Sequence, residues 1–360
     1  MGMSLFLINF VLCLIWAFIY TSIPPQNARQ KKSVLLLMLI QLWFVHSFID
    51  CVPDVPLLKE RFLAMKGYSY VDIIQFNTEC SFMEPGWLAF CKTITLFSDN
   101  FTIVMAINSF FLLFFYYKSI NEYSPYIMLS WILFVLINYN QSLFVLRQTL
   151  VMSLCVFSYK YIIESRKWPF ILCMIAGTLI HKTCIIFSLL YLIYNLRNKK
   201  LFYLTILVMV VVLSVGYSQL MGSFSELLSY EHYNEAETGM NWTGFLISLV
   251  LFVTYIVVLR KRIYDDGINR IVFISLLIST LGLLFGSQYS GYGASRLYEY
   301  FSIAAIFSIP ITAKYLADKN LRVLFIFVVT ILYFILAYRR IIEDDSFWDM
   351  IVTLHPQYKM

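Results

Sequence analysis

The chain has 360 residues, of which 60% are hydrophobic and only 13% are charged, and its formal net charge is +6. A soluble protein needs about a quarter of its residues charged to cover its surface, so the composition excludes a soluble globular protein. The apolar runs are about 20 residues long, which suits helices that cross a bilayer and excludes the short alternating strands of a transmembrane β-barrel. The sequence therefore predicts an all-α, polytopic transmembrane helical bundle.

Clusters of Lys and Arg separate the apolar segments, which predict about 11–12 spans. Their approximate cores are 3–22, 33–50, 99–117, 125–140, 143–162, 168–195, 201–218, 243–259, 270–287, 297–313 and 322–338. Segment 168–195 is too long for one straight span and short for two. It is either a hairpin of two short helices or one long broken helix, which membranes tolerate where the backbone faces protein or a wet cavity.

The basic residues orient these spans, because short cytoplasmic loops carry an excess of Lys and Arg. If 168–195 is a hairpin, most of the 27 Lys and Arg residues face the cytoplasm, so the net charge indicates topology and not nucleic-acid binding. Two longer loops then lie outside, 51–100 and 219–242. The first holds an apolar stretch that suits a helix along the interface, with Trp87 as its anchor. We expect one integral membrane domain over residues 1–360.

The seven cysteines are scattered and show no metal-ligand spacing, so the sequence predicts no metal site. Cys51, Cys80 and Cys91 lie on the predicted outer side, where a disulfide could form. Free, partly buried thiols are the favoured interpretation.

Ionisable residues at membrane depth are costly and are functional candidates. Arg147 and Gln148 follow a polar run, residues 138–142, that includes Asn140. An isolated arginine would extend to the lipid headgroups, but the polar neighbours favour a wet pocket that binds substrate.

His181 and Lys182 interrupt the apolar segment 168–195 near its middle. A lone histidine is more often a satisfied core residue than a catalyst. Here the neighbouring cation would lower the imidazole pKa and keep the ring neutral, ready to accept a proton.

Arg296 lies in the run GSQYSGYGASRLYEY. A flexible outer loop would explain the glycines, but Tyr292 and Tyr298 have aromatic faces and hydrogen-bonding edges that suit a sugar ring. Guanidinium groups bind phosphate oxygens. A lipid-linked sugar pyrophosphate would therefore satisfy both the cations and the aromatic residues, and no cofactor is needed.

Several motifs occur together in one order. Residues 140–195 carry LRQ at 146–148, the basic helix end YKYIIESRKWPF and the run LIHKTCIIFSLLYLIYNL around His181; weaker motifs are MEPGW at 83–87, SRLYEYF around Arg296 and PQYK at 356–359. In these motifs the chain resembles the EpsG-like, Wzy-type polysaccharide polymerases of bacterial membranes. It departs from them after the second span, where CVPDVPLLKERF replaces the usual arginine and Gly-x-Asp-Tyr run.

The resemblance implies a glycosyltransferase that joins undecaprenyl-pyrophosphate-linked oligosaccharide repeat units into O-antigen, capsule or exopolysaccharide. Its fold would be similar to the GT-C-like helical bundles. The active site would lie on the periplasmic or extracytoplasmic side of the bacterial plasma (inner) membrane. Partners would be membrane lipid and a chain-length regulator and flippase of the same pathway, with no nucleic acid.

Arg147 and Arg296 would then hold the pyrophosphate, and His181 would accept the proton of the acceptor hydroxyl, with Lys182 adding positive charge. The reverse assignment places His181 on the phosphate and Glu84 or Glu299 as the base.

An O-antigen ligase is the nearest alternative, but loop 219–242 is short for one. A flippase without chemistry would show two related halves, which the sequence lacks, and an acyltransferase would need its histidine on the cytoplasmic side.

Overall fold

The structure is a computed structural model that describes residues 2–50, 54–80, 82–143, 145–196, 198, 200–208, 211, 242–264, 266–286, 298–343 and 351–352. The chain divides into two compact units, Met1–Ser153 with Leu324–Met360, and Leu154–Val323.

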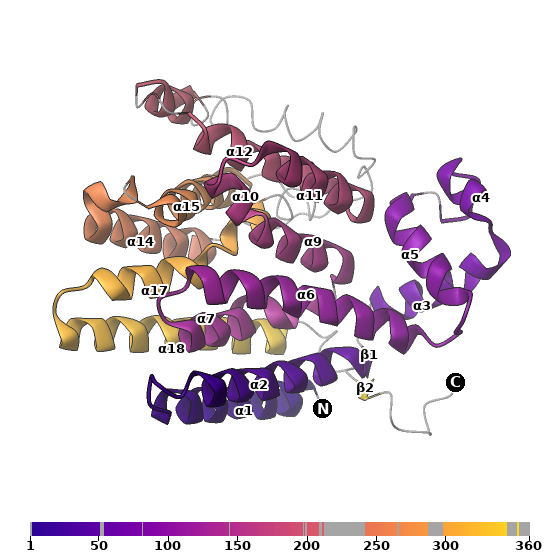
Figure 1. Cartoon of the computed structure of the whole chain (residues 1–360), viewed down its shortest axis with the longest axis horizontal. Coiled ribbons are helices and arrows are strands. Elements are labelled where there is room, and N and C mark those ends of the chain that lie inside the picture. Colours follow the sequence, from indigo (N-terminus) through magenta and orange to yellow (C-terminus); the bar gives the residue numbers. More distant parts are fainter. Residues whose placement is uncertain are drawn as a thin grey trace. The chain divides into compact units, whose positions relative to one another are not determined.

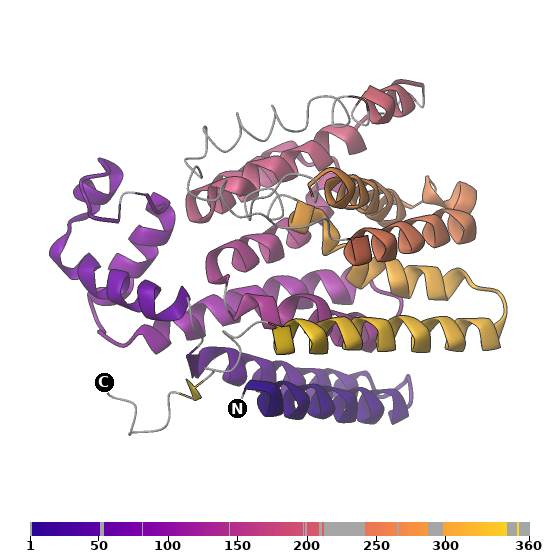
Figure 2. The same cartoon turned by 180° about the vertical axis from the view of Figure 1, so that it is seen from behind.

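The first unit begins with a helical hairpin, α1 (Gly2–Ser22) and α2 (Ala28–Ser47), whose helices lie side by side in both views (Figure 1 and Figure 2). Two consecutive prolines follow α1, and they cannot continue a helix because proline has no backbone N–H. Between the helices, the Trp16 indole donates to Gln41 Oε1 at 2.6 Å and the Gln41 amide donates to Asn9 Oδ1 at 2.7 Å. Such bonds join helices where lipid offers no hydrophobic driving force.

The predicted outer loop folds as a cluster of short helices. In chain order these are α3 (Asp54–Ala64), the 3-10 helix η1 (Met65–Gly67), α4 (Tyr70–Ile74) and α5 (Pro85–Thr95). Ser69 and Asp72 form a capping box at the start of α4, with each side chain accepting the other's backbone N–H. Helix α5 forms from the stretch expected to lie along the interface. However, Trp87 is only 2% exposed, so it packs inside the loop and does not act as the expected surface anchor.

The rest of the first unit carries the polar run. After α6 (Phe101–Tyr123) come α7 (Ile127–Phe134), a π-helical turn η2 (Val135–Tyr139), α8 (Asn140–Ser142) and α9 (Leu146–Phe157), which continues into the second unit. The C-terminal part of α18 (Lys319–Glu343) packs Phe334 against Phe10 of α1, with ring centroids 5.1 Å apart. A two-residue strand β1 (Ile49–Asp50) pairs antiparallel with β2 (Ile351–Val352).

The second unit holds the ambiguous segment and the remaining spans. Its elements are α10 (Tyr159–Ile163), α11 (Lys167–Ile180), the 3-10 helix η3 (Lys182–Phe187), α12 (Ser188–Tyr194), α14 (Trp242–Leu259), the 3-10 helix η5 (Arg260–Ile263), α15 (Gly267–Gly286) and α17 (Ala305–Tyr315). Helices α14 and α15 pack together, joined by a hydrogen bond of 2.8 Å between the Ser248 and Thr280 hydroxyls and by one from the Tyr255 hydroxyl to the Asn269 carbonyl.

Five helices of the described chain are long and apolar enough to cross a membrane. These segments are Leu5–Ser22, Phe101–Tyr123, Trp242–Ile263, Gly267–Leu284 and Lys319–Arg339, and shorter apolar helices cover Ile127–Ser142, Lys167–Ile180 and Lys182–Tyr194. The prediction of an all-α, polytopic membrane protein is therefore confirmed. The total of 11–12 spans stays a prediction, because part of the chain lies outside the described residues.

Candidate functional site

Arg147 and Glu84 form an ion pair in the first unit. One guanidinium N–H of Arg147, at the start of α9, donates to Glu84 Oε2, although the two residues are 63 positions apart in the chain. Glu84 is the residue that precedes the first turn of α5, where the partial positive charge of a helix N-terminus stabilises a carboxylate. A buried carboxylate requires such partners. Sequence reasoning named both residues as candidates but did not pair them.

Arg147 is the more accessible partner of the ion pair. The Glu84 side chain is 6% exposed, whereas the Arg147 side chain is 23% exposed. An arginine offers five N–H donors in a rigid fork, and one of the terminal nitrogens of Arg147 contacts Glu84. Glu84 therefore fixes one edge of the guanidinium, and the exposed remainder is suited to an oxyanion such as a phosphate.

The charge of Arg147 also acts on a buried thiol in the outer loop. Burial raises the pKa of Cys91 on α5 to about 12, and the positive charge of Arg147 opposes this shift in part. A thiol with a raised pKa is unreactive at neutral pH. Cys80 and Cys91 are both free thiols, and Cys51 lies outside the described residues, so a disulfide that includes Cys51 is untested.

The polar residues on either side of Arg147 are more deeply buried than the lining of a water-filled pocket would be. Asn138 and Ser142 are 3% and 1% exposed, and Gln148 is fully buried; Asn140 is half-buried. The polar run 138–142 overlaps the end of the π-helical turn Val135–Tyr139, a feature that is frequent at functional sites. Part of this polar surface therefore serves packing.

A buried histidine, His46, holds this run in place. The His46 ring lies 2.6 Å from the Ser109 hydroxyl through Nδ1 and 3.0 Å from the Ser142 carbonyl through Nε2. Because a carbonyl only accepts, Nε2 donates to Ser142, and Nδ1 faces the Ser109 hydroxyl, which also donates to the Met105 carbonyl at 2.7 Å. The Tyr139 hydroxyl also donates to the Leu42 carbonyl at 2.6 Å. Helices α2 and α6 thus fix the backbone that leads to Arg147.

In the second unit, His181 ends α11 and turns the chain. Its backbone is extended, with φ −154° and ψ 110°, and its N–H closes the last helical turn on the Gly177 carbonyl at 2.8 Å. The rings of Phe170 and Tyr191 stack with centroids 4.6 Å apart, so α11 and α12 run back beside one another. The segment is therefore a hairpin, one of the two predicted alternatives. His181 is 2% exposed, and Lys182 begins η3.

A hydrogen bond connects the hairpin tip to the segment that follows Arg296. The Thr183 and Tyr300 hydroxyls lie 2.9 Å apart, and both side chains are buried. Nearby, the rings of Phe187 and Phe301 stack with centroids 5.8 Å apart. Thr183 gave no signal in the sequence beyond its place two residues after His181.

Tyr298 is the described member of the predicted aromatic group. It lies against Gly282 of α15, where an added Cβ would come within 2.5 Å of the Tyr298 Cβ. Only glycine permits so close an approach. Arg296 and Tyr292 lie outside the described residues, as does the predicted loop 219–242 apart from Trp242. The structure thus brings Arg147 to Glu84 in one unit, and in the other it brings Thr183, two residues after His181, to Tyr300.

A metal centre finds no support in the described part of the chain, where no group of three His, Cys, Asp or Glu side chains is placed to hold an ion. Comparison with known proteins identifies the EpsG family, whose model matches residues 59–351. No curated protein and no solved structure matches the chain.

Proposed function

Since this chain belongs to the EpsG family over most of its length, we propose that it is a glycosyltransferase that joins undecaprenyl-pyrophosphate-linked oligosaccharide repeat units on the outer face of the bacterial plasma membrane. Family membership supports a polysaccharide polymerase-like function in general, and that function implies a lipid-linked oligosaccharide as the substrate. The product would be O-antigen, capsule or exopolysaccharide.

The observation that carries the proposal is the Arg147–Glu84 ion pair. A pyrophosphate leaving group gains negative charge as the glycosidic bond to it breaks, and a fixed guanidinium is the group that stabilises such charge best. Because Glu84 already binds Arg147, it acts as a positioning residue for the arginine. This contact favours the assignment in which Glu84 is not the base.

In the proposed reaction, an acceptor sugar hydroxyl attacks the anomeric carbon of the donor glycan. The bond from that carbon to the pyrophosphate oxygen breaks, and undecaprenyl pyrophosphate leaves with the electron pair. Arg147 and Arg296 bind the pyrophosphate, and His181 takes the proton of the hydroxyl. Asn140, Gln148, Lys182, Tyr292 and Tyr298 complete the proposed substrate site. A chain-length regulator and a flippase of the same pathway would be its partners.

A reconstituted reaction tests this function. Purified protein in liposomes would receive undecaprenyl-pyrophosphate-linked repeat units, and the products would be separated by size. We expect glycans longer than one repeat unit and release of undecaprenyl pyrophosphate, both lost in Arg147→Ala. Transfer of lipid-linked units across the bilayer without polymer would identify a flippase, and would refute the proposal.

A further inference from the structure

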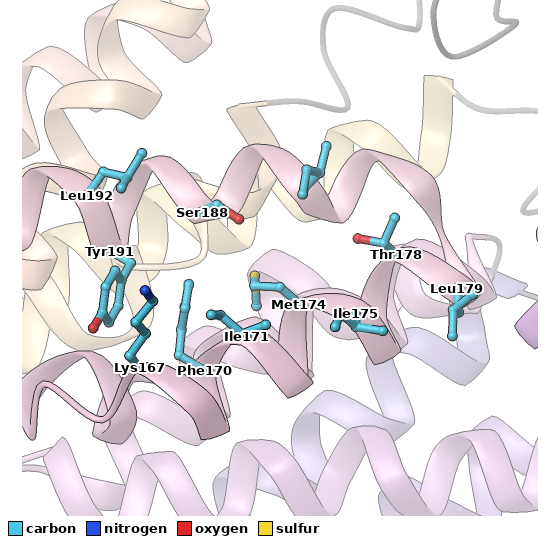
Figure 3. A pocket seen from close by; sticks show the side chains of 11 residues that line it. Lys167, Phe170, Ile171, Met174, Ile175, Thr178, Leu179, Ser188, Tyr191 and Leu192 are labelled. Carbon is cyan, nitrogen blue, oxygen red and sulfur yellow. The ribbon is translucent and has the colours of Figure 1, made fainter.

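A groove runs between the two arms of the His181 hairpin, in the second unit. It encloses a cavity of about 450 Å³, within the range of pockets that bind small molecules. Its walls are formed by α11 on one side and by η3 and α12 on the other (Figure 3). Lys167 lies at one end together with Phe170 and Tyr191, and Leu179 lies at the other.

The lining is mostly apolar, and apart from Lys167 its polar groups include the hydroxyls of Ser188 and Thr178. Ile171, Met174, Ile175 and Leu192 supply most of the walls. Several of these side chains stay open to the surroundings, with Ile175 53% and Leu192 61% exposed. In a helix hairpin that lies in a bilayer, such a groove faces hydrocarbon. An unbranched acyl chain is the ligand that matches a long apolar groove of this kind.

The basic end of the groove selects the headgroup. Lys167 begins α11 and is exposed, and within the described residues it forms no ion pair; its ammonium lies 5.8 Å from the centroid of the Trp168 ring. By contrast, the neighbouring Arg166 pairs with Glu164 at 3.3 Å. An uncompensated lysine beside an exposed tryptophan is typical of the headgroup region of a membrane, where basic pockets between helices bind anionic lipid headgroups.

We propose that this groove, formed by α11, η3 and α12, is a binding site for an anionic phospholipid, with the phosphate on Lys167 and one acyl chain along the apolar walls. The bound lipid fills the space between the two arms and so holds the hairpin that carries His181 at its tip. The proposal does not depend on the reaction that the protein catalyses, because Lys167 and the groove residues lie outside the proposed substrate site.

Native mass spectrometry of the full-length protein in detergent tests the site, with phosphatidylglycerol and phosphatidylcholine of equal chain length as probes. We expect phosphatidylglycerol to bind with a defined stoichiometry and Lys167→Glu to weaken it about tenfold. Arg166→Glu is the matched charge control, because its side chain lies outside the groove. If both substitutions weakened binding equally, the attraction would be unspecific and the site would be refuted.

A second pair of variants tests the groove itself. Ile175→Trp would fill the cavity and displace the acyl chain, whereas Leu172→Trp changes a residue of α11 that is also exposed, at 65%, but does not line the groove. We expect loss of phosphatidylglycerol only in the first variant. Equal binding of phosphatidylcholine, or loss of undecaprenyl phosphate binding in Ile175→Trp, would overturn the proposal, the latter by assigning the groove to the carrier lipid.

Discussion

Glu84→Gln gives the sharpest test of how the Arg147 site works. The substitution keeps the shape of a side chain that is 6% exposed and removes the charge that binds Arg147. A charge-assisted hydrogen bond is about twice as strong as a neutral one. The free energy that holds the Arg147 guanidinium in position therefore falls by about 1–2 kcal/mol. We expect the polymerisation rate to fall about tenfold. Arg147→Ala removes the guanidinium and should lower the polymerisation rate about 100-fold to 1,000-fold, as for other groups that stabilise developing charge.

The double variant separates a positioning role from an independent one. Initial rates would be measured in liposomes for wild type, Glu84→Gln, Arg147→Ala and both together. If Glu84 acts only through Arg147, the double variant equals Arg147→Ala, because residues that act as one unit are not additive. Asp99→Asn is the control, since it breaks the exposed Lys66–Asp99 pair of the same loop and should leave the rate unchanged. Two effects that multiply would refute the reasoning and would favour Glu84 as the base.

Three further predictions test local contacts in the described part of the chain. Gly282→Ala would place a Cβ 2.5 Å from the Tyr298 Cβ, so we expect the unfolding free energy to fall by about 1–3 kcal/mol; an unchanged thermal midpoint in detergent would contradict the close approach. Thr183→Val removes the hydrogen bond to the Tyr300 hydroxyl and should cost about 0.5–1.5 kcal/mol, whereas Thr183→Ser should keep the wild-type midpoint. The hydrogen bonds from Ser69 lower the pKa of the Asp72 carboxyl. The capping box therefore stabilises α4 fully at pH values above the unfolded-state pKa of Asp72. This stabilisation is lost as the pH falls through the lower pKa of the folded state. The protection factors of the α4 amides should fall on acidification, and Ser69→Ala, which keeps the backbone hydrogen bond to Asp72, should weaken that pH dependence; a response of unchanged size in this variant would assign it to other groups.

The sequence predicted the elements that depend on local pattern. The apolar runs gave α1, α6, α14, α15 and α18 nearly in full, because helix formation in a bilayer requires only length and hydrophobicity. The break at His181 was visible as an interrupted apolar run. Which of the two forms it takes depends on the contact of Phe170 with Tyr191, a packing detail that composition does not encode.

The contacts that hold the candidate site depend on pairs far apart in the chain. Glu84 meets Arg147, Thr183 meets Tyr300, and His46 meets both Ser109 and Ser142. Nothing in the spacing of one sequence gives such partners, because they follow from how the helices pack. The π-helical turn before Arg147 was hidden for the same reason, since its composition does not differ from that of an α-helix.

The most direct test of the polymerase function is the glycan ladder on a gel from a deletion strain that expresses wild type, Arg147→Ala or His181→Ala. We expect wild type to restore a ladder of many repeat units, and each variant to leave glycan with a single repeat unit. A deletion strain that carries no repeat unit at all would indicate a ligase or flippase. A ladder unchanged by the deletion would contradict the proposed function altogether.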